Sequence, residues 1–324
     1  MKVLITGATG FIGTHLIPRL NQIRDCQIVA AIRNEDSQKK LPTTVATAIV
    51  GEIDDQTNWS KALSEVEVVI HLAARAHILQ EQVPNPEAEF IRVNTKGTAN
   101  LVQQSIQAGV KHFIFISSIG AMATLSNEIL NETSSCQPDT PYGRSKLQAE
   151  QALINLASNS SMTWTILRPT LVYGEGNPGN MASLIKLVKL GLPLPLGLVN
   201  NRRSFLYVGN LVDAIAVCLT HSQAQNQLFV LSDGQTLSTP ELIKLIARTL
   251  NRSIVLIPIP LSLIKLLGVV ADRLEKLLGK PLPVNSSTVN RLLGSLTVDN
   301  SLICQTLNWQ PPYTIDEGFS KSLS

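Results

Sequence analysis

Tyr142 and Lys146 stand four residues apart in the stretch PDTPYGRSKLQAE, at the predicted start of a helix. Four residues is about one helical turn, so the phenol and the ammonium would project from the same face. A phenol with a pKa of about 10 is a poor base at neutral pH, and a neighbouring cation lowers that pKa. The pair could therefore exchange a proton with a hydroxyl or a carbonyl. The same spacing also occurs by chance on solvated helices.

Two serines, Ser117 and Ser118, end the apolar run FIFISS upstream of the tyrosine. We predict a strand over this run, which places both hydroxyls at a carboxyl end of the sheet, where open α/β folds bind ligands. Ser118 could hydrogen-bond the same oxygen whose proton Tyr142 handles.

Three glycines, Gly7, Gly10 and Gly13, lie in TGATGFIG between the first predicted strand and the first predicted helix. The missing side chains would let the backbone approach a pyrophosphate at the positive N-terminus of the helix. With a dinucleotide there, Tyr142 would move a proton while a hydride moves to or from the nicotinamide. The alternative is a tight strand–helix turn that binds nothing.

The end of the second predicted strand bears on the choice of dinucleotide. A NAD enzyme places Asp or Glu there on the ribose hydroxyls, whereas AAIRNED has Arg33 at this position. A guanidinium suits the 2′-phosphate of NADP, so Arg33 favours NADP over NAD. A surface arginine stacked on adenine, or paired with Glu35 or Asp36, is the alternative.

Short β-branched runs alternate with helical patterns through the first half of the chain. This alternation predicts an α/β fold with a doubly wound parallel sheet of the Rossmann type. We expect strands over residues 2–7, 27–33, 47–53, 66–74, 111–118 and 163–169, with helices over residues 11–23, 94–110 and from 142. The dinucleotide-binding domain would span residues 1–172, with 204–233 returning to it as a helix and a strand. Residues 173–324 would form a smaller, mixed α/β substrate domain.

Composition excludes several classes of protein. The 324 residues are 44% apolar with a formal charge of +3, and no block of like charges favours nucleic-acid binding. Four scattered cysteines show neither metal-ligand spacing nor a disulfide framework, which favours free thiols in a reducing compartment. The N-terminus runs directly into a strand pattern without room for a signal peptide, so we expect a cytoplasmic protein.

The stretch Ile254–Val270 is apolar enough to suggest a membrane. Pro258, Pro260 and Lys265 interrupt it, and it is shorter than the ~20 residues that a spanning helix needs. We therefore predict a strand followed by a core-facing helix and no integral span. A helix lying on a membrane surface is the alternative.

Beyond the glycines and YGRSK, the ordered set VIHLAA, VNTKGTANLV, LRPTLVYG, RRSFLYVGNLVDAI and LNWQPPYTIDEGF covers nearly the whole chain. It resembles the extended short-chain dehydrogenase/reductases of the NAD-dependent epimerase/dehydratase family, in particular the UDP-glucose 4-epimerase-like members. The resemblance implies a catalytic set of Ser118, Tyr142 and Lys146. It implies cofactor contacts from Gly7, Gly10, Phe11, Ile12, Gly13, Arg33, Glu52, Ile53, Leu72, Ala73, Ala74, Asn94, Ser117, Tyr142, Lys146, Arg168 and Pro169.

The resemblance also assigns roles on the substrate side. Ser118, Tyr142, Asn180, Arg203 and Arg291 would hold a nucleotide sugar, with the two arginines on its diphosphate, because a guanidinium fork matches phosphate oxygens. Asn94 would be a buried helix residue that supports the site. Arg168, Pro169 and Tyr173 would form a strand-end loop near the nicotinamide. No metal is implied.

Departures from the family pattern narrow the activity. Sugar dehydratases of the family carry an Asp-Glu pair after the catalytic serine, whereas this chain has Ile119 and Gly120, which cannot transfer protons. A C4 epimerase and a 4-keto reductase, both found among enzymes of bacterial polysaccharide sugars, remain open. Arg33 tilts the choice towards NADPH and reduction. Arg75 and His77 could reach the sugar, although such residues are more often structural or solvent-facing.

Two other hypotheses stay open beside the sugar enzymes. One is a dinucleotide-binding sensor or scaffold without turnover, since a fold does not imply activity. The other is a reductase of a non-sugar ketone. The family resemblance further implies a homodimer formed through two long helices, one of which carries Tyr142.

Overall fold

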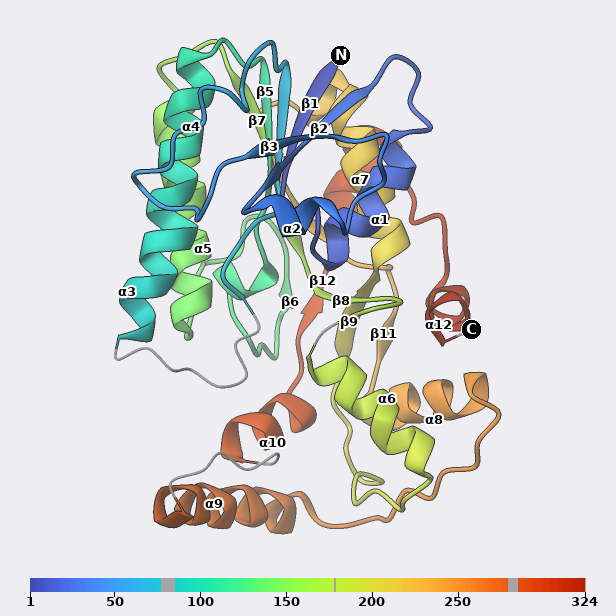
Figure 1. Ribbon diagram of the computed structural model, residues 1–324. Helices are drawn as coiled ribbons and strands as arrows, with labels where there is room; N and C mark the ends of the chain where they lie inside the picture. Colours follow the sequence, from blue (N-terminus) through green and yellow to red (C-terminus); the bar gives the residue numbers. More distant parts are fainter. Residues whose placement is uncertain (77–84, 178, 279–284, 324) are drawn as a thin grey trace.

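The computed structural model describes residues 1–76, 85–177, 179–278 and 285–323. Its largest element is a parallel sheet in the strand order β10-β7-β5-β4-β1-β2-β3. The strands are β1 (Lys2–Thr6), β2 (Gln27–Ile32), β3 (Ala46–Ile49), β4 (Val68–His71), β5 (His112–Ile116), β7 (Thr163–Pro169) and β10 (Gln227–Leu231). The order runs outward from β1 in both directions, so the predicted doubly wound sheet is confirmed (Figure 1).

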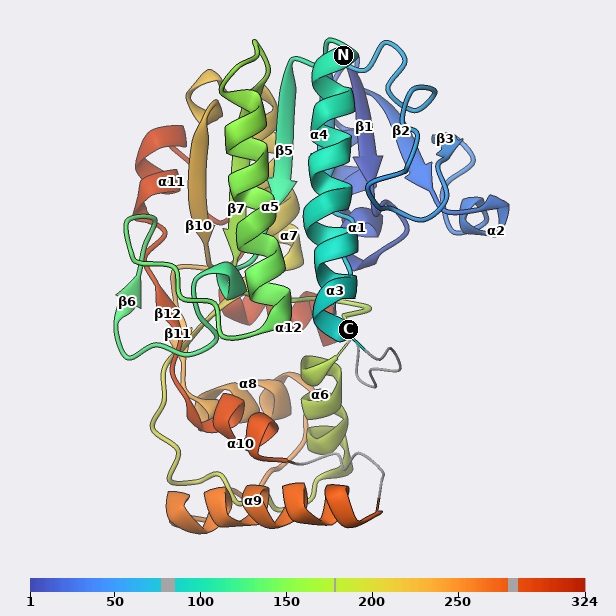
Figure 2. The same ribbon diagram turned by 90° about the vertical axis from the view of Figure 1, so that its left-hand side faces the viewer.

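Helices cover both faces of the sheet. Helices α4 (Gly97–Gln107) and α5 (Pro141–Ala157) lie side by side on one face, and α1 (Phe11–Leu20) and α7 (Val208–Thr220) pack together on the other (Figure 2). Alternation along β5 explains the two layers, because Phe113 and Phe115 point into the core under α4 and α5 whereas Ile114 and Ile116 point the other way.

Two short helices flank this domain. Helix α2 (Glu35–Gln38) follows β2 and is capped by Asn34, whose side chain accepts a hydrogen bond from the Ser37 backbone N–H. Helix α3 (Pro86–Phe90) runs through a π-helical turn (Ile91–Lys96) into α4. The predicted helix over residues 94–110 is therefore longer and locally underwound, because a π-helical turn contains more residues than an α-helical one, and such turns are frequent at functional sites.

Residues 204–233 return to the sheet, as expected, through α7 and β10. The segment begins with a strand, however, because β9 (Arg203–Tyr207) pairs with β8 (Leu171–Tyr173) and with β11 (Thr236–Leu237) in a second, three-stranded sheet. The predicted helix over residues 203–221 is therefore wrong for its first turn. Four of the five β9 residues are buried, which strand pairing allows and a helix at this place would not.

The C-terminal part lies below the carboxyl ends of the sheet strands (Figure 1). It contains α6 (Asn180–Leu190), α8 (Thr239–Thr249), α9 (Leu261–Leu278) and α10 (Ser286–Leu293). A capping box between Ser238 and Glu241 starts α8. The chain then returns upward through β12 (Thr297–Val298), which pairs with β6 (Ile129–Leu130), and ends in α11 (Ser301–Leu307) and α12 (Ile315–Leu323).

The prediction for Ile254–Val270 is correct for the helix, which is α9, but wrong for the strand and for the burial of the helix. Leu256 forms only an isolated bridge with Leu194, and α9 turns most of its leucines outward. The physical reason is that α9 packs along one narrow face, against α10, and the other faces find no partner in the described residues. None of the helices that the structure describes is both long and apolar enough to cross a membrane.

Candidate active site

The glycine loop fits tightly between β1, β4 and α1. Gly7 has a positive φ of 71°, and a Cβ there would lie 2.8 Å from the Ala73 backbone nitrogen. A Cβ at Gly13 would lie 2.5 Å from the carbonyl oxygens of Gly7 and Ala8. At Gly10, which precedes α1, a Cβ would meet only the Gly7 oxygen, at 3.2 Å. The loop therefore needs glycine for its own packing and leaves the N-terminus of α1 approachable by an anion.

A cavity of about 540 Å³ opens beside this loop, across the carboxyl ends of β1, β2 and β4. Several of the predicted cofactor residues line it, namely Gly7, Arg33, Glu52, Ile53, Ala73 and Ala74. Phe11, Ile12 and Leu72 instead pack, partly buried, against the core. The cavity and the open helix N-terminus fit a dinucleotide with its pyrophosphate at the loop.

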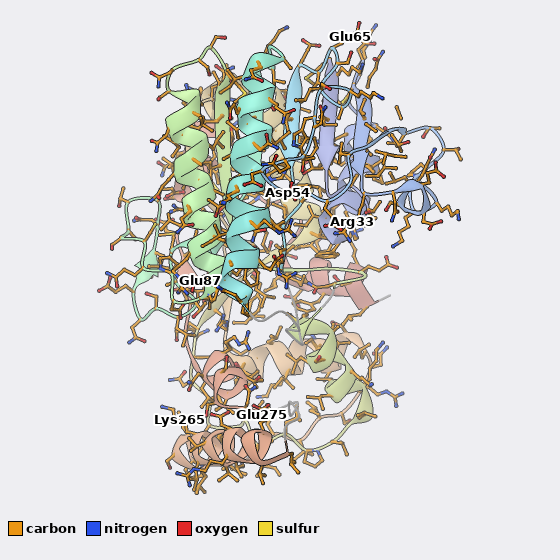
Figure 3. The ribbon with its side chains drawn as sticks, turned by 60° about the vertical axis from the view of Figure 1, so that its left-hand side comes forward. Arg33, Asp54, Glu65, Glu87, Lys265 and Glu275 are labelled. Atoms are coloured by element: carbon orange, nitrogen blue, oxygen red, sulfur yellow. The ribbon has the colours of Figure 1, made fainter. Side chains whose placement is uncertain are left out.

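Arg33 directly follows β2 and lines the cavity (Figure 3). Its Nε stands 2.9 Å from Oε1 of Glu52, and both side chains are more than half exposed. The predicted alternative, in which Arg33 pairs with Glu35 or Asp36, is therefore wrong. An exposed ion pair contributes about 0–1 kcal/mol, so a phosphate could replace Glu52 as the partner of Arg33. Lys40 also lines the cavity.

The start of α5 brings Tyr142 and Ser118 together. Thr140 caps the helix by accepting a hydrogen bond from the Gly143 N–H, at 3.1 Å, and Pro141 occupies the first turn. A Cβ at Gly143 would lie 2.1 Å from the Gly120 oxygen, so the helix approaches the turn after Ser118 closely. There the Ser118 hydroxyl hydrogen-bonds the Tyr142 hydroxyl.

Lys146 lies beneath this pair and is almost completely buried. Its Nζ donates to the Ile116 carbonyl at 2.6 Å and lies 4.1 Å from the centroid of the Phe115 ring. Burial lowers the pKa of Lys146 to about 7, while the carboxylate of Glu150 acts in the opposite direction. A lysine that titrates near neutrality can pass a proton on.

The pKa of Tyr142 does not move in the expected direction. Burial raises it above its usual value, and only the hydrogen bond from Ser118 acts to lower it. The Lys146 ammonium donates to the Ile116 carbonyl at the end of β5 instead of to Tyr142, because that carbonyl lies within its reach. Among the protein's own groups, burial therefore affects the pKa of Tyr142 more than the Lys146 ammonium does.

A buried ion pair lies one helical turn beyond Lys146. Arg168 donates from Nε to Oε1 of Glu150 at 3.0 Å and from a terminal nitrogen to Oε2 at 2.6 Å. Ser117 donates its hydroxyl to the same carboxylate. The side chains of Ser117 and Arg168 thus face Glu150, and their expected contacts with the cofactor stay a prediction. The i, i+4, i+8 spacing of Tyr142, Lys146 and Glu150 was a signal for this third residue.

Asn94 has the supporting position that the resemblance implied. It is buried in the π-helical turn, where its Oδ1 accepts from the Arg75 N–H at 2.7 Å. Its Nδ2 donates to the Arg75 carbonyl at 3.1 Å and to Oγ of Ser145 at 3.0 Å. Asn94 therefore ties the loop after β4 to the helix that carries Tyr142 and Lys146.

A chain of hydrogen bonds that sequence reasoning missed continues from Asn94. The Thr98 hydroxyl donates to the Asn94 carbonyl at 2.6 Å. The His71 ring forms hydrogen bonds with the hydroxyls of Thr98, at 2.9 Å, and of Thr6, at 2.6 Å. Burial lowers the pKa of His71 to about 3, so its imidazole is neutral. The chain links the ends of β1 and β4 under the glycine loop.

The strand-end loop after β7 runs from Pro169, at the sheet, to Tyr173, in the core. Pro169 ends β7 beside Leu231 of β10. Tyr173 is fully buried, stacks on Phe319 with ring centroids 4.2 Å apart, and donates to Asp233 at 3.0 Å. Its ring therefore belongs to the core, and the expected position of this loop near the nicotinamide stays a prediction.

Arg75 and the substrate residues occupy two further places. Arg75 lines the cavity, and its guanidinium lies 5.6 Å from the centroid of the Phe90 ring, which in turn packs edge-on against Tyr142. His77 lies outside the described residues, and Asn180 is the first residue of α6. In the part of the chain that the structure covers, no cluster of His, Cys, Asp and Glu could hold a metal ion, and all four cysteines are free thiols.

The structure brings Arg203 and Arg291 together. Arg203 begins β9 and donates to the carbonyl oxygens of Arg291, at 2.9 Å, and Gly294, at 3.2 Å. Burial and the nearby charge of Arg291 both lower the pKa of Arg203. Two cations held this close favour an anion between or beside them.

Comparisons with known proteins place this geometry in a family. The model of the NAD dependent epimerase/dehydratase family matches residues 3–231. A UDP-glucose 4-epimerase of Vibrio cholerae is 40% identical, with 99% of this chain and 94% of that protein covered. An N-acetyl-alpha-D-glucosaminyl-diphospho-ditrans,octacis-undecaprenol 4-epimerase of Escherichia coli O157:H7 is 31% identical over the same shares, 99% and 94%.

Solved structures agree on the fold. The UDP-glucose 4-epimerase of Thermotoga maritima, solved with UDP-glucose, superimposes with a TM-score of 0.75 at 23% identity, covering 99% of this chain and 97% of that one. With these matches over nearly its whole length, the chain belongs to the NAD-dependent epimerase/dehydratase family.

Proposed function

We propose that this protein is a 4-epimerase that interconverts the C4 configurations of a UDP-hexose or a UDP-N-acetylhexosamine with a bound nicotinamide dinucleotide. The observation that carries the proposal is the hydrogen-bonded pair of Ser118 and Tyr142 above buried Lys146, beside a cavity of dinucleotide size. Residues 1–172 with 204–233 would hold the dinucleotide, and residues 173–324 the sugar nucleotide. Both relatives named above are 4-epimerases.

The dinucleotide, when bound, supplies the hydride acceptor. Tyr142, as the phenolate, would take the proton of the sugar C4 hydroxyl as that carbon is oxidised, and it would return the proton to the C4 oxygen on reduction. Ser118 hydrogen-bonds the same oxygen and keeps it in line with the phenol. Lys146, with its pKa near 7, exchanges the proton with Tyr142 and stabilises the phenolate.

The arginine pair would hold the sugar nucleotide by its diphosphate. Arg203 and Arg291 already share a backbone contact, and a diphosphate would offset the mutual repulsion that lowers the pKa of Arg203. Anchoring at the diphosphate leaves the hexose free to rotate, which an epimerase needs in order to present either face of the 4-keto sugar. A role in surface polysaccharide sugars follows from this substrate class.

A 4-keto reductase is the second candidate, and Arg33 is the observation that favours it. Arg33 and Lys40 line the ribose end of the cavity, where two cations suit the 2′-phosphate of NADPH. A reductase delivers hydride once and needs fresh reduced cofactor. An epimerase keeps its NAD and regenerates it.

The substrate could also carry its diphosphate on a polyprenol, as the printed name of the Escherichia coli relative describes for that protein. The apolar surface of α9 favours this variant of the proposal. For the assembly, we propose a homodimer through α4 and α5, which lie side by side on one face (Figure 2).

The test is mass spectrometry of the small molecules that purify with the protein, together with conversion of UDP-glucose and UDP-N-acetylglucosamine without added cofactor. Bound NAD and conversion of either sugar support the epimerase. An empty site, with reduction of a 4-keto sugar that requires NADPH, supports the reductase. Bound dinucleotide without any turnover would contradict both and favour the sensor.

A further inference from the structure

One side of α9 is an exposed apolar stripe. Its members are Leu263, Leu266, Leu267, Val270, Leu274 and Leu278, each between 42% and 59% exposed. They recur at helical spacing and so lie along one face of the helix. This α9 stripe is the side of the helix that we predicted, wrongly, to face the core.

The face of α9 next to the stripe fixes its direction. Ile264 is buried there, and a Cβ at Gly268 would lie 3.1 Å from the Cα of Ser286 at the start of α10. Asp272 accepts a hydrogen bond from the Ser286 N–H at 3.0 Å, and Glu275 lies on the side that faces α10 (Figure 3). Because these contacts hold one face against α10, the α9 stripe points away from the protein.

Two neighbouring segments extend the apolar surface. Residues 194–197 pair with residues 255–257, for example through the Leu194 N–H and the Val255 carbonyl at 2.9 Å. Leu192, Leu198, Val255 and Ile257, on or beside these segments, are 41–60% exposed. Both segments lie at the same end of the molecule as α9 (Figures 1 and 2). A contiguous apolar surface of this extent marks an interaction site in most proteins.

The exposed charged side chains of α6, of α9 and of the segment before α9 are positive. Lys265 and Arg273 on α9 are exposed, as are Lys186 and Lys189 on α6 and Arg252 before α9. Within residues 181–200 and 251–278 the acids are Asp272 and Glu275. Asp272 is bonded to the start of α10, and Glu275 accepts a long hydrogen bond, at 3.4 Å, from Asn285, which precedes α10. The surface that faces outward is therefore apolar with a cationic border.

We propose that this end of the protein docks on the surface of an anionic lipid bilayer, with α9 lying in the interface. Leucines buried at the acyl boundary and cations at the headgroup phosphates are the pattern of helices that lie on membranes. The long stems of Lys265 and Arg273 can cover apolar surface while their charges reach the phosphates.

A second copy of the chain fits the same surface less well. A two-fold interface would set the patch on itself, so its cationic border would meet a cationic border. The acids of α9 could not relieve this repulsion, because they lie on the α10 side. Anionic lipid supplies the complementary charge directly.

Docking would bring the proposed diphosphate site close to the membrane. Helix α10 carries Arg291 and packs directly on α9, so a single helical layer separates that arginine from the lipid. The sheet lies at the other end of the molecule (Figure 1). Its dinucleotide cavity opens at the carboxyl ends of β1, β2 and β4. Docking itself is measured without turnover, so its test is independent of the proposed activity.

The test is flotation of the full-length protein with vesicles of phosphatidylcholine, with or without phosphatidylglycerol. We expect the protein to float with the anionic vesicles and much less with the neutral ones. Replacing Leu266 and Leu267 together by serine should lower the bound-to-free ratio at least about tenfold. Replacing Lys265 and Arg273 together by glutamine should lower it roughly fivefold per charge, on the anionic vesicles only.

Ile129→Ser is the matched control, because Ile129 is equally exposed, at 66%, but lies on β6, away from this end. It should float like the unchanged protein. Circular dichroism and conversion of UDP-sugars without vesicles should be unaltered in the leucine variant, so a failure of docking is distinguishable from a failure of the proposed activity. Flotation that the leucine variant does not change would overturn the proposal. So would light scattering in which that variant changes the oligomeric state while flotation stays the same.

Discussion

The carboxyl edge of the sheet and the α9 end of the molecule treat their side chains in opposite ways. At the sheet edge, buried polar groups satisfy one another, as Glu150 does with Arg168 and His71 with Thr6 and Thr98. At the α9 end, leucines are exposed to solvent beside exposed lysine and arginine side chains. The buried polar groups named at the sheet edge find their partners within the chain, whereas the leucines of the α9 end are exposed to solvent.

This difference has an energetic meaning. Removing one partner from a buried pair leaves an unsatisfied charge or dipole, which costs several kcal/mol. Removing an exposed side chain costs a few tenths of a kcal/mol unless a partner is present. Variants at the two ends should therefore separate loss of chemistry or folding from loss of docking.

The largest effect is expected at the sheet edge, in Tyr142→Phe. The variant keeps the ring that packs against Phe90 but loses the proton donor, so turnover should fall by about 10²- to 10⁴-fold. Dinucleotide affinity, measured by calorimetry, should stay within about threefold, since a phenylalanine ring fills the same space. Near-normal turnover would remove Tyr142 from the mechanism.

Glu150→Gln tests the buried network directly. The change leaves the Arg168 guanidinium buried with a neutral partner, and we expect the free energy of unfolding to fall by about 3–5 kcal/mol in urea titrations. The control is Arg144→Gln, which breaks the exposed pair of Arg144 and Glu87 and should cost less than about 1 kcal/mol. Equal losses in the two variants would show that burial does not distinguish the pairs.

Two leucine truncations compare the same chemistry at both ends. Leu153, on α5, is fully buried, and Leu153→Ala should cost about 2–5 kcal/mol of unfolding free energy. Leu267→Ala on α9 should stay within about 0.5 kcal/mol without lipid, because the side chain is 59% exposed. A large loss in Leu267→Ala would mean that the stripe contributes to the fold and is not a free surface.

The last test is the pH dependence of stability that His71 contributes. Burial lowers its pKa from 6.5 to about 3, so between these pH values the unfolded chain binds a proton that the folded chain does not. Stability from this group is therefore lost as the pH falls, by up to about 1.4 kcal/mol per pH unit.

The variant His71→Gln lacks this titration. The difference in unfolding free energy between the unchanged protein and the variant should shrink as the pH is lowered from neutrality into this window. A difference that is independent of pH would show that the pKa of His71 is the same in the folded and the unfolded protein.

The sheet and the position of Tyr142 at the start of a helix could be predicted because their signals are local. The strand runs are short and apolar, and Tyr142, Lys146 and the glycine loop are each read within one turn or one loop. The Glu150–Arg168 pair joins residues that are far apart in the sequence, so only the 4-residue spacing after Lys146 hinted at it. The stacking of Tyr173 on Phe319 could not be predicted for the same reason, because Phe319 comes from the last helix.

The α9 segment shows a different limit. A run of leucines with helical spacing predicts an apolar face, and that prediction is correct. Whether such a face is covered depends on what packs against it, and α10 takes only the face that carries Ile264 and Gly268. Composition alone cannot tell a core helix from a helix whose apolar face is exposed.

The central claim is that a hydride leaves C4 of the sugar and returns to it within the site formed by Ser118, Tyr142 and Lys146. The most direct measurement uses UDP-glucose that carries deuterium at C4, incubated with the purified protein and followed by mass spectrometry of the product hexose. The account predicts a product of inverted C4 configuration that retains the deuterium. Loss of the deuterium to solvent during inversion would contradict it.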